Sequence, residues 1–597
     1  MTLPRAWRDY QAIRACRPRA VTDAPALIPD SKVGQLDHLL HTSGVLELID
    51  AELQGRPGPE GLPLRTVLVS LMLALHYHAS ATLADACRVL LDELRPAAKD
   101  WLGVPVLDDD HGRIAFCRRV YRSFDRLTTA LDPARCDRRR RLPQALADAH
   151  AATWEDNDPE HARRRAVLQE ISDRLVLISV RLAIGRGAFK HWNGDVGADT
   201  TAVPAWHKPS NTFRDLGSIE TTAGFHYSAG DTEGTFGHSA TLLVAASRRH
   251  PTGHHLTGER VSRHPQLALG LVLDTGGKRL GPNAVHALTA LTPLGLPVGL
   301  LAADRAYTDQ TSDHFQLHVR RAGYLLALDY KQDQRGVQGT HRGIPLIDGS
   351  LACPNTPQAL ANATTGLDDQ AIRRLDPQLV ERIAAREPYF LKLKQGPGPQ
   401  GTMRLQCPAA GPSPSVTCPR FNRLHPRPTG PATVVDLTDQ RALAAHPAAK
   451  PAVQITPAER FRPPTKKSLP LICQQPTITI KPGELGKLDK FRQDRHYLSP
   501  DWHDAYKPIR AHNEGINGRV KGHRIDLAEP KRRLAHGRAA QALLVALMIC
   551  MLNLQILHDW QHTTGQPPPD TDLTSTPPSG EPSATGPTPN GRPPPLN

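Results

Sequence analysis

The order of strand-like and helix-like segments between residues 191 and 330 is the feature that most constrains the fold. Short runs of β-branched and small apolar residues predict five strands, at 195–203, 239–246, 268–274, 298–303 and 324–329. A helical pattern of Ala and Leu over 282–291 separates the third strand from the fourth. Consecutive strands followed by helix–strand alternation are typical of an α/β sheet with helices on its faces.

The rest of the chain divides into regions that differ in composition and in hydrophobic pattern. With 597 residues the chain is too long for a single core. Residues 1–190 carry helical patterns, including a strongly apolar helix at 64–75. Pro and Gly rise between 331 and 490, which predicts a β-rich insertion, and helical patterns return within 491–562. Residues 563–597 have almost no apolar content, so we expect a disordered, Pro-rich tail.

Inside the insertion, short apolar runs predict strands at 389–394, 433–437 and 477–480, and one helix over 378–386. After the insertion, the helical pattern resumes near His512. It then runs, with breaks, to about residue 562.

The net charge of +14 is unevenly distributed along the chain. Arginine-rich clusters occur at 136–141, 162–165 and 530–538. Ordinary arginine usage in a chain rich in Ala, Arg, Pro and Gly explains much of the arginine but less of its clustering. The clustering therefore favours a polyanion as the partner of this protein.

Cysteine usage and hydropathy indicate the compartment. Nine cysteines are an odd and sparse number, which does not describe a disulfide scaffold. Residues 1–30 lack the apolar core of a secretory signal, and the longest apolar run, 542–552, is too short to span a bilayer. We expect a soluble, cytoplasmic protein with no membrane partner, in which that run is a buried helix.

Four of the cysteines fall in the insertion. They are Cys353, Cys407, Cys418 and Cys473. Four thiolates in one small domain can hold a structural zinc ion. Their spacing is irregular and includes no C-x₂-C pair, so buried or unpaired thiols are the default expectation and zinc is the alternative.

Three distant carboxylates stand where a fold could bring them together. Asp199 lies within the first predicted strand, and Asp304 ends the fourth. Glu514 lies on a predicted helix, with Arg510 one turn before it and Lys521 two turns after it on nearly the same face. Two carboxylates on neighbouring strands and a third from a helix packed across them can bind Mg²⁺, which prefers oxygen ligands. The alternatives are a solvated, salt-bridged helix and ordinary turn or cap aspartates.

These motifs resemble the DDE transposases of bacterial insertion sequences, in the branch with a YREK signature. The matching residues are Asp199-Thr-Thr, Asp304-Arg-Ala-Tyr307 and the set Tyr506, Arg510, Glu514 and Lys521. The resemblance covers roughly residues 190–560. It implies an α/β fold with an RNase H-like catalytic domain, formed by 191–330 and 491–562 and interrupted by the insertion 331–490. The helical region 1–190 resembles the end-binding region of such enzymes only loosely.

The resemblance also implies a role for each matching residue. The catalytic metal ligands would be Asp199, Asp304 and Glu514. They would hold two Mg²⁺ ions, for which Mn²⁺ can substitute. Arg510 and Lys521 would contact DNA phosphates, and Tyr506 would help to position the strand. Two departures from the family pattern are present: three residues rather than two separate Tyr506 from Arg510, and Ala306 stands where glycine is common.

Asp195 competes with Asp199 as the first ligand, because both point to the same face of a strand. The Asp-Thr-Thr context favours Asp199. The expected activity is Mg²⁺-dependent cleavage at transposon ends and strand transfer into target DNA. Double-stranded DNA would be the partner, and a homodimer in the synaptic complex is compatible with the resemblance. The alternatives are an RNase H-like nuclease without strand transfer and a catalytically inactive, DNA-binding derivative of a transposase.

Overall fold

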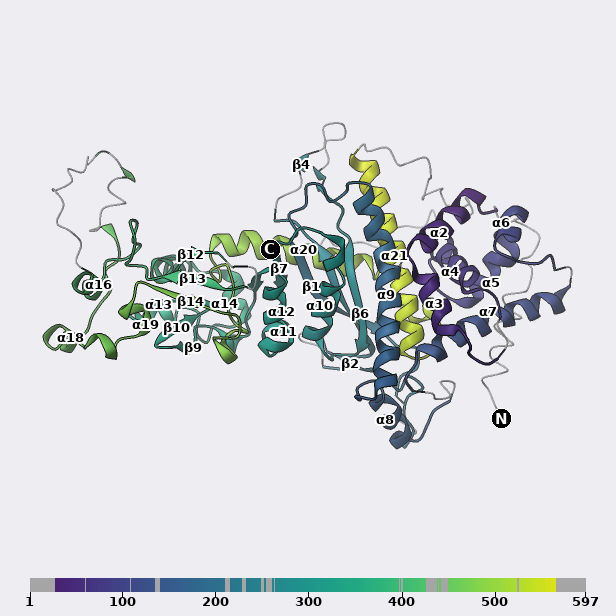
Figure 1. The fold of residues 1–597 in the computed structure, drawn as a ribbon, viewed down its shortest axis with the longest axis horizontal. Helices are drawn as coiled ribbons and strands as arrows, with labels where there is room; N and C mark the ends of the chain where they lie inside the picture. Colours follow the sequence, from purple (N-terminus) through teal and green to yellow (C-terminus); the bar gives the residue numbers. More distant parts are fainter. Residues whose placement is uncertain are drawn as a thin grey trace, which may run out of the picture.

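The computed structural model describes residues 27–564, with gaps at 59–60, 108, 135–139, 210–214, 228–231, 249–251, 254–259, 262, 397, 399–400, 426–437, 439, 442–448 and 523–524. The predicted strand at 433–437 and the predicted tail at 563–597, beyond Thr564, lie outside the described residues. The protein is a mixed α/β structure of elongated shape (Figure 1). Helices from the N-terminal region lie at one end, the main sheet lies in the middle, and the insertion forms the other end.

The central sheet has six strands. They are β1 (Val196–Pro204), β2 (Gly224–His226), β3 (Thr235–Ala245), β6 (Ala268–Thr275), β7 (Leu300–Ala303) and β8 (Leu325–Leu328). β3 pairs antiparallel with β1 on one edge and with β6 and β2 on the other. β7 pairs parallel with β1, and β8 pairs parallel with β7. The order β6-β3-β1-β7-β8 therefore joins an antiparallel half to a parallel half. A separate two-stranded ribbon pairs β4 (Thr252–Gly253) with β5 (Arg260–Val261).

The five predicted strands correspond to β1, β3, β6, β7 and β8, with ends shifted by at most four residues. Strands β3, β6 and β7 are buried along almost their whole length, which requires cover on both faces. Helix α10 (Leu280–Thr289) packs on β3 and β6, and α20 (Pro500–Arg519) packs on β1, β7 and β8. The short helices α11 (Arg305–Thr308) and α12 (Gln316–Arg321) lie beside β8.

The chain before the sheet is helical. Its elements are α2 (Asp30–Thr42), α3 (Val45–Leu53), α4 (Leu64–His78), α5 (Leu83–Arg88), the π-helix η1 (Val89–Glu93), α6 (Pro96–Trp101), α7 (Asp110–Leu131), α8 (Gln144–Ala152) and α9 (Pro159–Gly185). The strongly apolar helix expected at 64–75 is α4. One hydrophobic core runs from Ile28 in this region, through the sheet, to Trp560. The N-terminal helices and the sheet therefore share a core, and a domain boundary at residue 190 stays a prediction.

Helix α21 (Arg538–Thr564) is the centre of that shared core. It packs against α9, β6 and α4, and it contains the apolar run at 542–552. Among the described residues it is the one unbroken helix long and apolar enough to cross a membrane, but 94% of its most apolar stretch is buried inside the protein. The expectation of a buried helix is confirmed, and this burial is consistent with a soluble protein.

The insertion has its own small core of apolar and cysteine side chains. Its strands form two sheets, β9 (Val337–His341) with β10 (Ile344–Ile347) and β11 (Ser350–Leu351), and β12 (Lys392–Gln395) with β13 (Met403–Gln406) and β14 (Thr477–Ile480). Its helices are α13 (Gln358–Ala361), α14 (Asp369–Arg374), α15 (Pro377–Arg386), α16 (Pro419–Leu424), α18 (Pro457–Phe461) and α19 (Leu471–Gln474). The insertion thus holds helices as well as strands.

The insertion is attached to the rest of the chain by a second apolar cluster and by a buried arginine, Arg386. Leu379 and Ile383 of α15 pack with residues of β7, β8 and α20. Arg386 at the end of α15 lies 2.6 Å from Asp348 Oδ2, and both side chains are almost fully buried. This pair joins two parts of the insertion, and removing one member of such a buried pair costs several kcal/mol. Arg386 Nη2 also donates to the Tyr497 carbonyl oxygen at 3.2 Å, which links the insertion to the segment before α20.

Two expectations about this half of the chain were wrong in their bounds. The helix expected to begin near His512 begins at Pro500, where Ser499 accepts a hydrogen bond from the Trp502 N–H. Pro508 inside the helix hides this start from the sequence pattern. The strand expected from Tyr389 begins at Lys392, because a 3₁₀ turn ends at Tyr389. The helix at 378–386 and the strand at 477–480 are confirmed as α15 and β14.

Candidate active site

Two of the predicted carboxylates lie side by side at one edge of the sheet. Ala198 of β1 is paired with Ala303 of β7, so the next residues along these parallel strands, Asp199 and Asp304, are neighbours. Asp304 is the N-cap of α11, and its Oδ1 accepts a hydrogen bond from the Ala306 N–H at 3.0 Å. The parallel pairing of β1 with β7 therefore assembles the first part of the expected site.

The two carboxylates repel each other in a poorly solvated place. Burial raises the pKa of Asp304, the charge of Asp199 raises it further, and the guanidinium of Arg510 opposes both effects. Burial also raises the pKa of Tyr307, whose hydroxyl lies 3.4 Å from Thr200 Oγ1 on β1. A cation placed between the aspartates would relieve the repulsion.

Helix α20 supplies the polar groups that face Asp199. Arg510 Nη1 lies 3.3 Å from Asp199 Oδ2. Seven residues later, Asn517 Nδ2 donates a hydrogen bond to the same oxygen at 2.9 Å. Burial is the largest single effect on the pKa of Arg510 and would lower it, but the surrounding acidic groups, led by Asp199, together outweigh burial and raise this pKa, so the guanidinium stays protonated. In this structure Arg510 orients a carboxylate, whereas a DNA phosphate was its expected partner.

The helix approaches β1 closely because β1 has a glycine at the crossing point. A Cβ atom added to Gly197 would lie 2.1 Å from Asn513 Oδ1 and 2.5 Å from Asn513 Nδ2. Asn513 is fully buried, and neither of its amide atoms has a hydrogen-bond partner. Gly197 therefore sets the distance between α20 and the strand that carries Asp199.

Tyr506 lies on the side of α20 that faces the aspartates. Its ring stacks on Trp502, with the centroids 4.4 Å apart. Trp502 Nε1 in turn donates to the Leu328 carbonyl oxygen at the end of β8. Burial raises the pKa of Tyr506 well above its usual range, and the charges of Asp329 and the two site aspartates add to this effect. Despite its shifted register, Tyr506 is thus near the carboxylates.

Glu514 lies on α20 and Lys521 lies just after it, and both side chains are exposed. Glu514 lies about 40° around the helix from Arg510 and further from the buried face. Among the described residues, no three His, Cys, Asp or Glu side chains are arranged to hold a metal ion, so the structure does not bring Glu514 together with Asp199 and Asp304. Burial lowers the pKa of His226 and the charge of Lys521 lowers it further, which places Lys521 near β2.

Asp195, the competitor of Asp199, occupies the other end of the pairing with β7. Its Oδ1 accepts a hydrogen bond from the Leu300 N–H at 2.9 Å, and its Oδ2 accepts one from Arg248 Nε at 2.7 Å. The side chain is buried and engaged in holding the start of β7. This geometry favours Asp199 as the functional aspartate of β1.

No protein-family model, curated protein or solved structure matches this chain.

The site contains residues that the sequence reasoning missed. Leu328 of β8 is paired with Ala303, so Asp329 follows β8 next to Asp304. Asp329 Oδ1 accepts hydrogen bonds from the Tyr497 hydroxyl at 2.7 Å and from the Tyr330 N–H at 2.8 Å. The signal for Asp329 was present, since it follows an apolar strand as Asp304 does. Asn517 had only the weaker signal of its seven-residue spacing from Arg510.

The carboxylate oxygens at this edge of the sheet are the type of ligand that a hard divalent cation prefers. Asp199 and Asp304 lie close together, and burial and the charge of Asp199 raise the pKa of Asp304, which favours cation binding between them. The pair fits Mg²⁺, while the third ligand of the expected set is not beside it. The exposed position of Glu514 is the main difference between the expected site and the structure.

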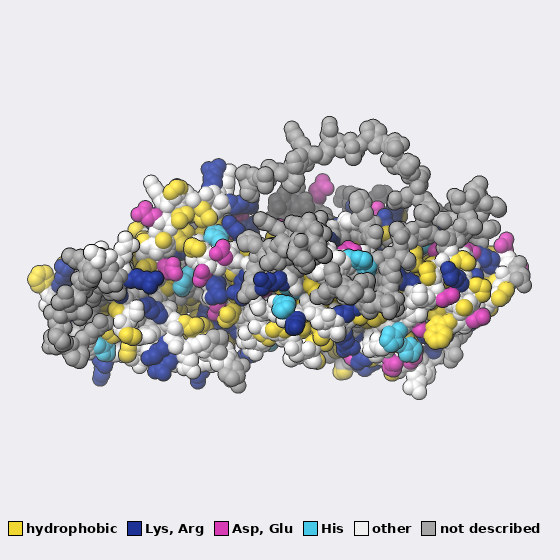
Figure 2. Space-filling model, turned by 90° about the horizontal axis from the view of Figure 1, so that it is seen from above, with side chains coloured by type: hydrophobic (Ala, Val, Ile, Leu, Met, Phe, Trp, Pro, Cys, Tyr) yellow, Lys and Arg dark blue, Asp and Glu magenta, His cyan; other side chains and the backbone are white. Residues whose placement is uncertain are grey.

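The arginine-rich clusters are used largely inside the protein. Arg164 and Arg533 are buried, and Arg538 Nη1 lies 2.8 Å from Asp274 Oδ1. Most of the cluster at 136–141 lies outside the described residues. On the face shown in Figure 2, Lys and Arg side chains lie mostly over the insertion and the middle of the molecule. The clusters at 162–165 and 530–538 are therefore poor evidence for a polyanion surface.

Proposed function

We propose that this protein is a DDE-type DNA transposase that cleaves phosphodiester bonds at transposon ends and joins them to target DNA. The observation that carries the proposal is the pairing of Asp199 and Asp304 at the ends of two adjacent parallel strands, with Arg510 of α20 against Asp199. The strand order β6-β3-β1-β7-β8 supports an RNase H-like assignment, because it puts one aspartate on a central strand and the other on its parallel neighbour.

Asp199 and Asp304 would hold Mg²⁺, or Mn²⁺ in its place. Glu514, the third ligand of the expected set, is exposed and would have to turn toward them to join the site. When bound, the two ions would activate the attacking hydroxyl and stabilise the leaving oxygen. The chain's own groups act around them. Arg510 and Asn517 hold the carboxylate of Asp199 in one orientation.

The proposed partner is double-stranded DNA, held through phosphate contacts from exposed basic side chains. Lys521 is exposed beside the site and is the first candidate for such a contact. A cytoplasmic location and a homodimer in the synaptic complex belong to the same proposal. Residues 1–190 would supply the readout of the transposon ends.

One observation favours a second candidate. Glu514 is exposed on α20, and the described residues contain no group of three metal-binding side chains at this edge. A catalytically inactive, DNA-binding derivative of a transposase would tolerate this placement. It differs from the first proposal only in whether the carboxylates act on DNA.

The test is an assay with Mg²⁺ and a duplex that carries the native ends of the element encoding this chain. Cleaved and joined products support the transposase. Cleavage without joining supports an RNase H-like nuclease. Binding without cleavage supports the inactive derivative, and failure to bind the ends at all overturns the proposal.

A further inference from the structure

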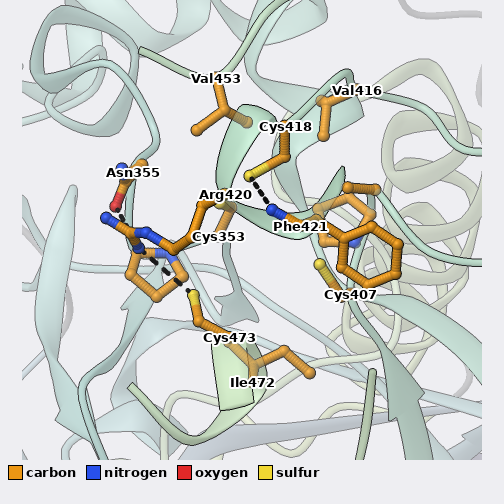
Figure 3. A pocket seen from close by; sticks show the side chains of 13 residues that line it. Cys353, Asn355, Cys407, Val416, Cys418, Arg420, Phe421, Val453, Ile472 and Cys473 are labelled. Carbon is orange, nitrogen blue, oxygen red and sulfur yellow. Dashed lines mark hydrogen bonds between the residues drawn. The ribbon is translucent and has the colours of Figure 1, made fainter. Parts of the chain in front are cut away.

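Four cysteines that are far apart in the sequence line one cavity in the insertion (Figure 3). They are Cys353, Cys407, Cys418 and Cys473. Cys353 follows β11, Cys407 follows β13, Cys418 is the N-cap of α16 and Cys473 lies in α19. The fold thus gathers in one place all four insertion cysteines, although their spacing had argued against a common site.

All four side chains line the same small cavity, although they come from four different parts of the insertion. Cys353, Cys407 and Cys418 are buried, and Cys473 is partly buried.

Three of the four cysteines stand at the start of a Cys-Pro turn that directs backbone N–H groups at the sulfur. The Phe421 N–H donates to Cys418 Sγ at 3.4 Å. Backbone N–H groups of Asn355 and Ala409 likewise point at the sulfurs of Cys353 and Cys407, respectively. Because N–H···S bonds stabilise negative charge on sulfur, these turns prepare the thiols to act as ligands.

The cavity between the sulfurs admits a small ion rather than an organic ligand. Its volume is about 10 Å³, which is room for roughly one water-sized sphere. The other lining groups are mostly apolar, such as Val416, Val453 and Ile472. Four soft sulfur ligands in an apolar shell are the donor set that zinc prefers, in tetrahedral geometry.

We propose that Cys353, Cys407, Cys418 and Cys473 form a tetrathiolate site for a structural zinc ion. As the side chains stand, the described residues hold no group arranged to bind a metal, so the thiols must turn toward the cavity centre. Binding forms four Zn–S bonds and releases four protons to solvent, which leaves a complex of charge −2. Arg420, whose Nη1 lies 3.6 Å from Cys473 Sγ, offsets part of that charge.

The zinc ion would cross-link the small core of the insertion. The ligands come from the ends of β11 and β13 and from α16 and α19, so one ion would connect both small sheets of the insertion. A core of this size gains little stability from apolar burial alone. The site does not depend on the transposase proposal, and its failure would leave that proposal untouched.

The experiment measures metal content in the full chain, purified without chelators. We expect one zinc per chain in the wild type and in the control Cys87→Ser, whose cysteine is buried in α5 outside the insertion. Cys407→Ser and Cys473→Ser are expected to lose the zinc. Retention of the metal by both variants would place it elsewhere and overturn the proposal. Absence of stoichiometric zinc from the wild type would also overturn it.

A second measurement covers the case in which the serine variants do not fold. Wild-type protein in which Co²⁺ replaces the zinc is expected to show the intense visible absorption of tetrahedral cobalt bound to thiolates. Octahedral, weakly coloured cobalt would overturn the proposal. So would alkylation showing that the four cysteines are joined in disulfides.

Discussion

Gly197 offers a direct way to perturb the proposed site without touching any of its charged groups. It lies two residues before Asp199 on β1, where α20 crosses the strand. The three heavy atoms nearest to an added Cβ all belong to the Asn513 amide, at 2.1, 2.5 and 2.6 Å. Gly197→Ala therefore forces α20 away from β1, and α20 carries Arg510 and Glu514.

The expected cost can be estimated from these distances. Contacts below 3 Å are not tolerated by real Cβ atoms, and Asn513 is fully buried, so it has little room to move. Overpacking of a tight core costs about 1–3 kcal/mol. A displacement of about 1 Å at the catalytic groups can lower the rate about 100-fold. We expect both effects in Gly197→Ala.

Thermal denaturation and single-turnover cleavage of end-containing DNA measure the two effects. The matched control is Gly197→Ala combined with Asn513→Ala, which removes all three of the clashing atoms. The double variant is expected to recover most of the stability and activity, so the two substitutions should show a coupling energy of about 1 kcal/mol or more. If Gly197→Ala is as stable and as active as the wild type, the packing of α20 on β1 described above is wrong.

Three further predictions test the electrostatics of the protein. Asp304→Asn is expected to raise the free energy of unfolding at neutral pH. Burial and the Asp199 charge raise the pKa of Asp304, so its charged form destabilises the folded protein, and a neutral amide avoids this cost. A variant that is less stable than the wild type in denaturant titration would contradict this. Arg510→Gln is expected to lose up to about 3 kcal/mol of stability in the same titration, because the carboxylate of Asp199 is left without its cation. The control Lys521→Gln changes an exposed side chain and is expected to keep the wild-type stability. It should instead reduce the slope of the salt dependence of DNA binding by about one. Burial lowers the pKa of His238 from 6.5 to about 4. The contribution of His238 to the free energy of unfolding is therefore full above pH 6.5 and falls by about 3 kcal/mol as the pH drops to 4. His238→Gln should remove this part of the pH dependence.

Much of the main sheet could be predicted because its strands are short, apolar and bounded by turn residues. β6, reading Ala268-Leu-Gly-Leu-Val-Leu-Asp-Thr275, has this pattern and was placed within one residue. α20 was harder to place, because Pro508 lies inside it and polar residues occupy its exposed side. The strands of the insertion were harder still, since each has four residues or fewer apart from β9.

In the candidate site too, features set by local sequence could be predicted, and features set by tertiary contacts could not. The resemblance predicted that Asp199 and Asp304 act together, and their positions in or after apolar strands were visible in the sequence. That β1 pairs with β7, from which it is separated by several strands and a helix, was not visible. The orientation of Glu514 could not be predicted, because it depends on how α20 rotates about its axis when Asn513 packs on Gly197. The grouping of the four insertion cysteines also depends on tertiary contacts, and their irregular spacing gave no sign of it.

The central claim is that Asp199 and Asp304 act together on DNA. The most direct measurement compares Mg²⁺-dependent cleavage of duplex transposon ends by the wild type, Asp304→Asn and the control Asp313→Asn, which neutralises an exposed carboxyl of the same type. The account predicts cleavage by the wild type and by Asp313→Asn, and none by Asp304→Asn although that protein is folded and still binds the ends. Cleavage by Asp304→Asn at the wild-type rate would contradict it.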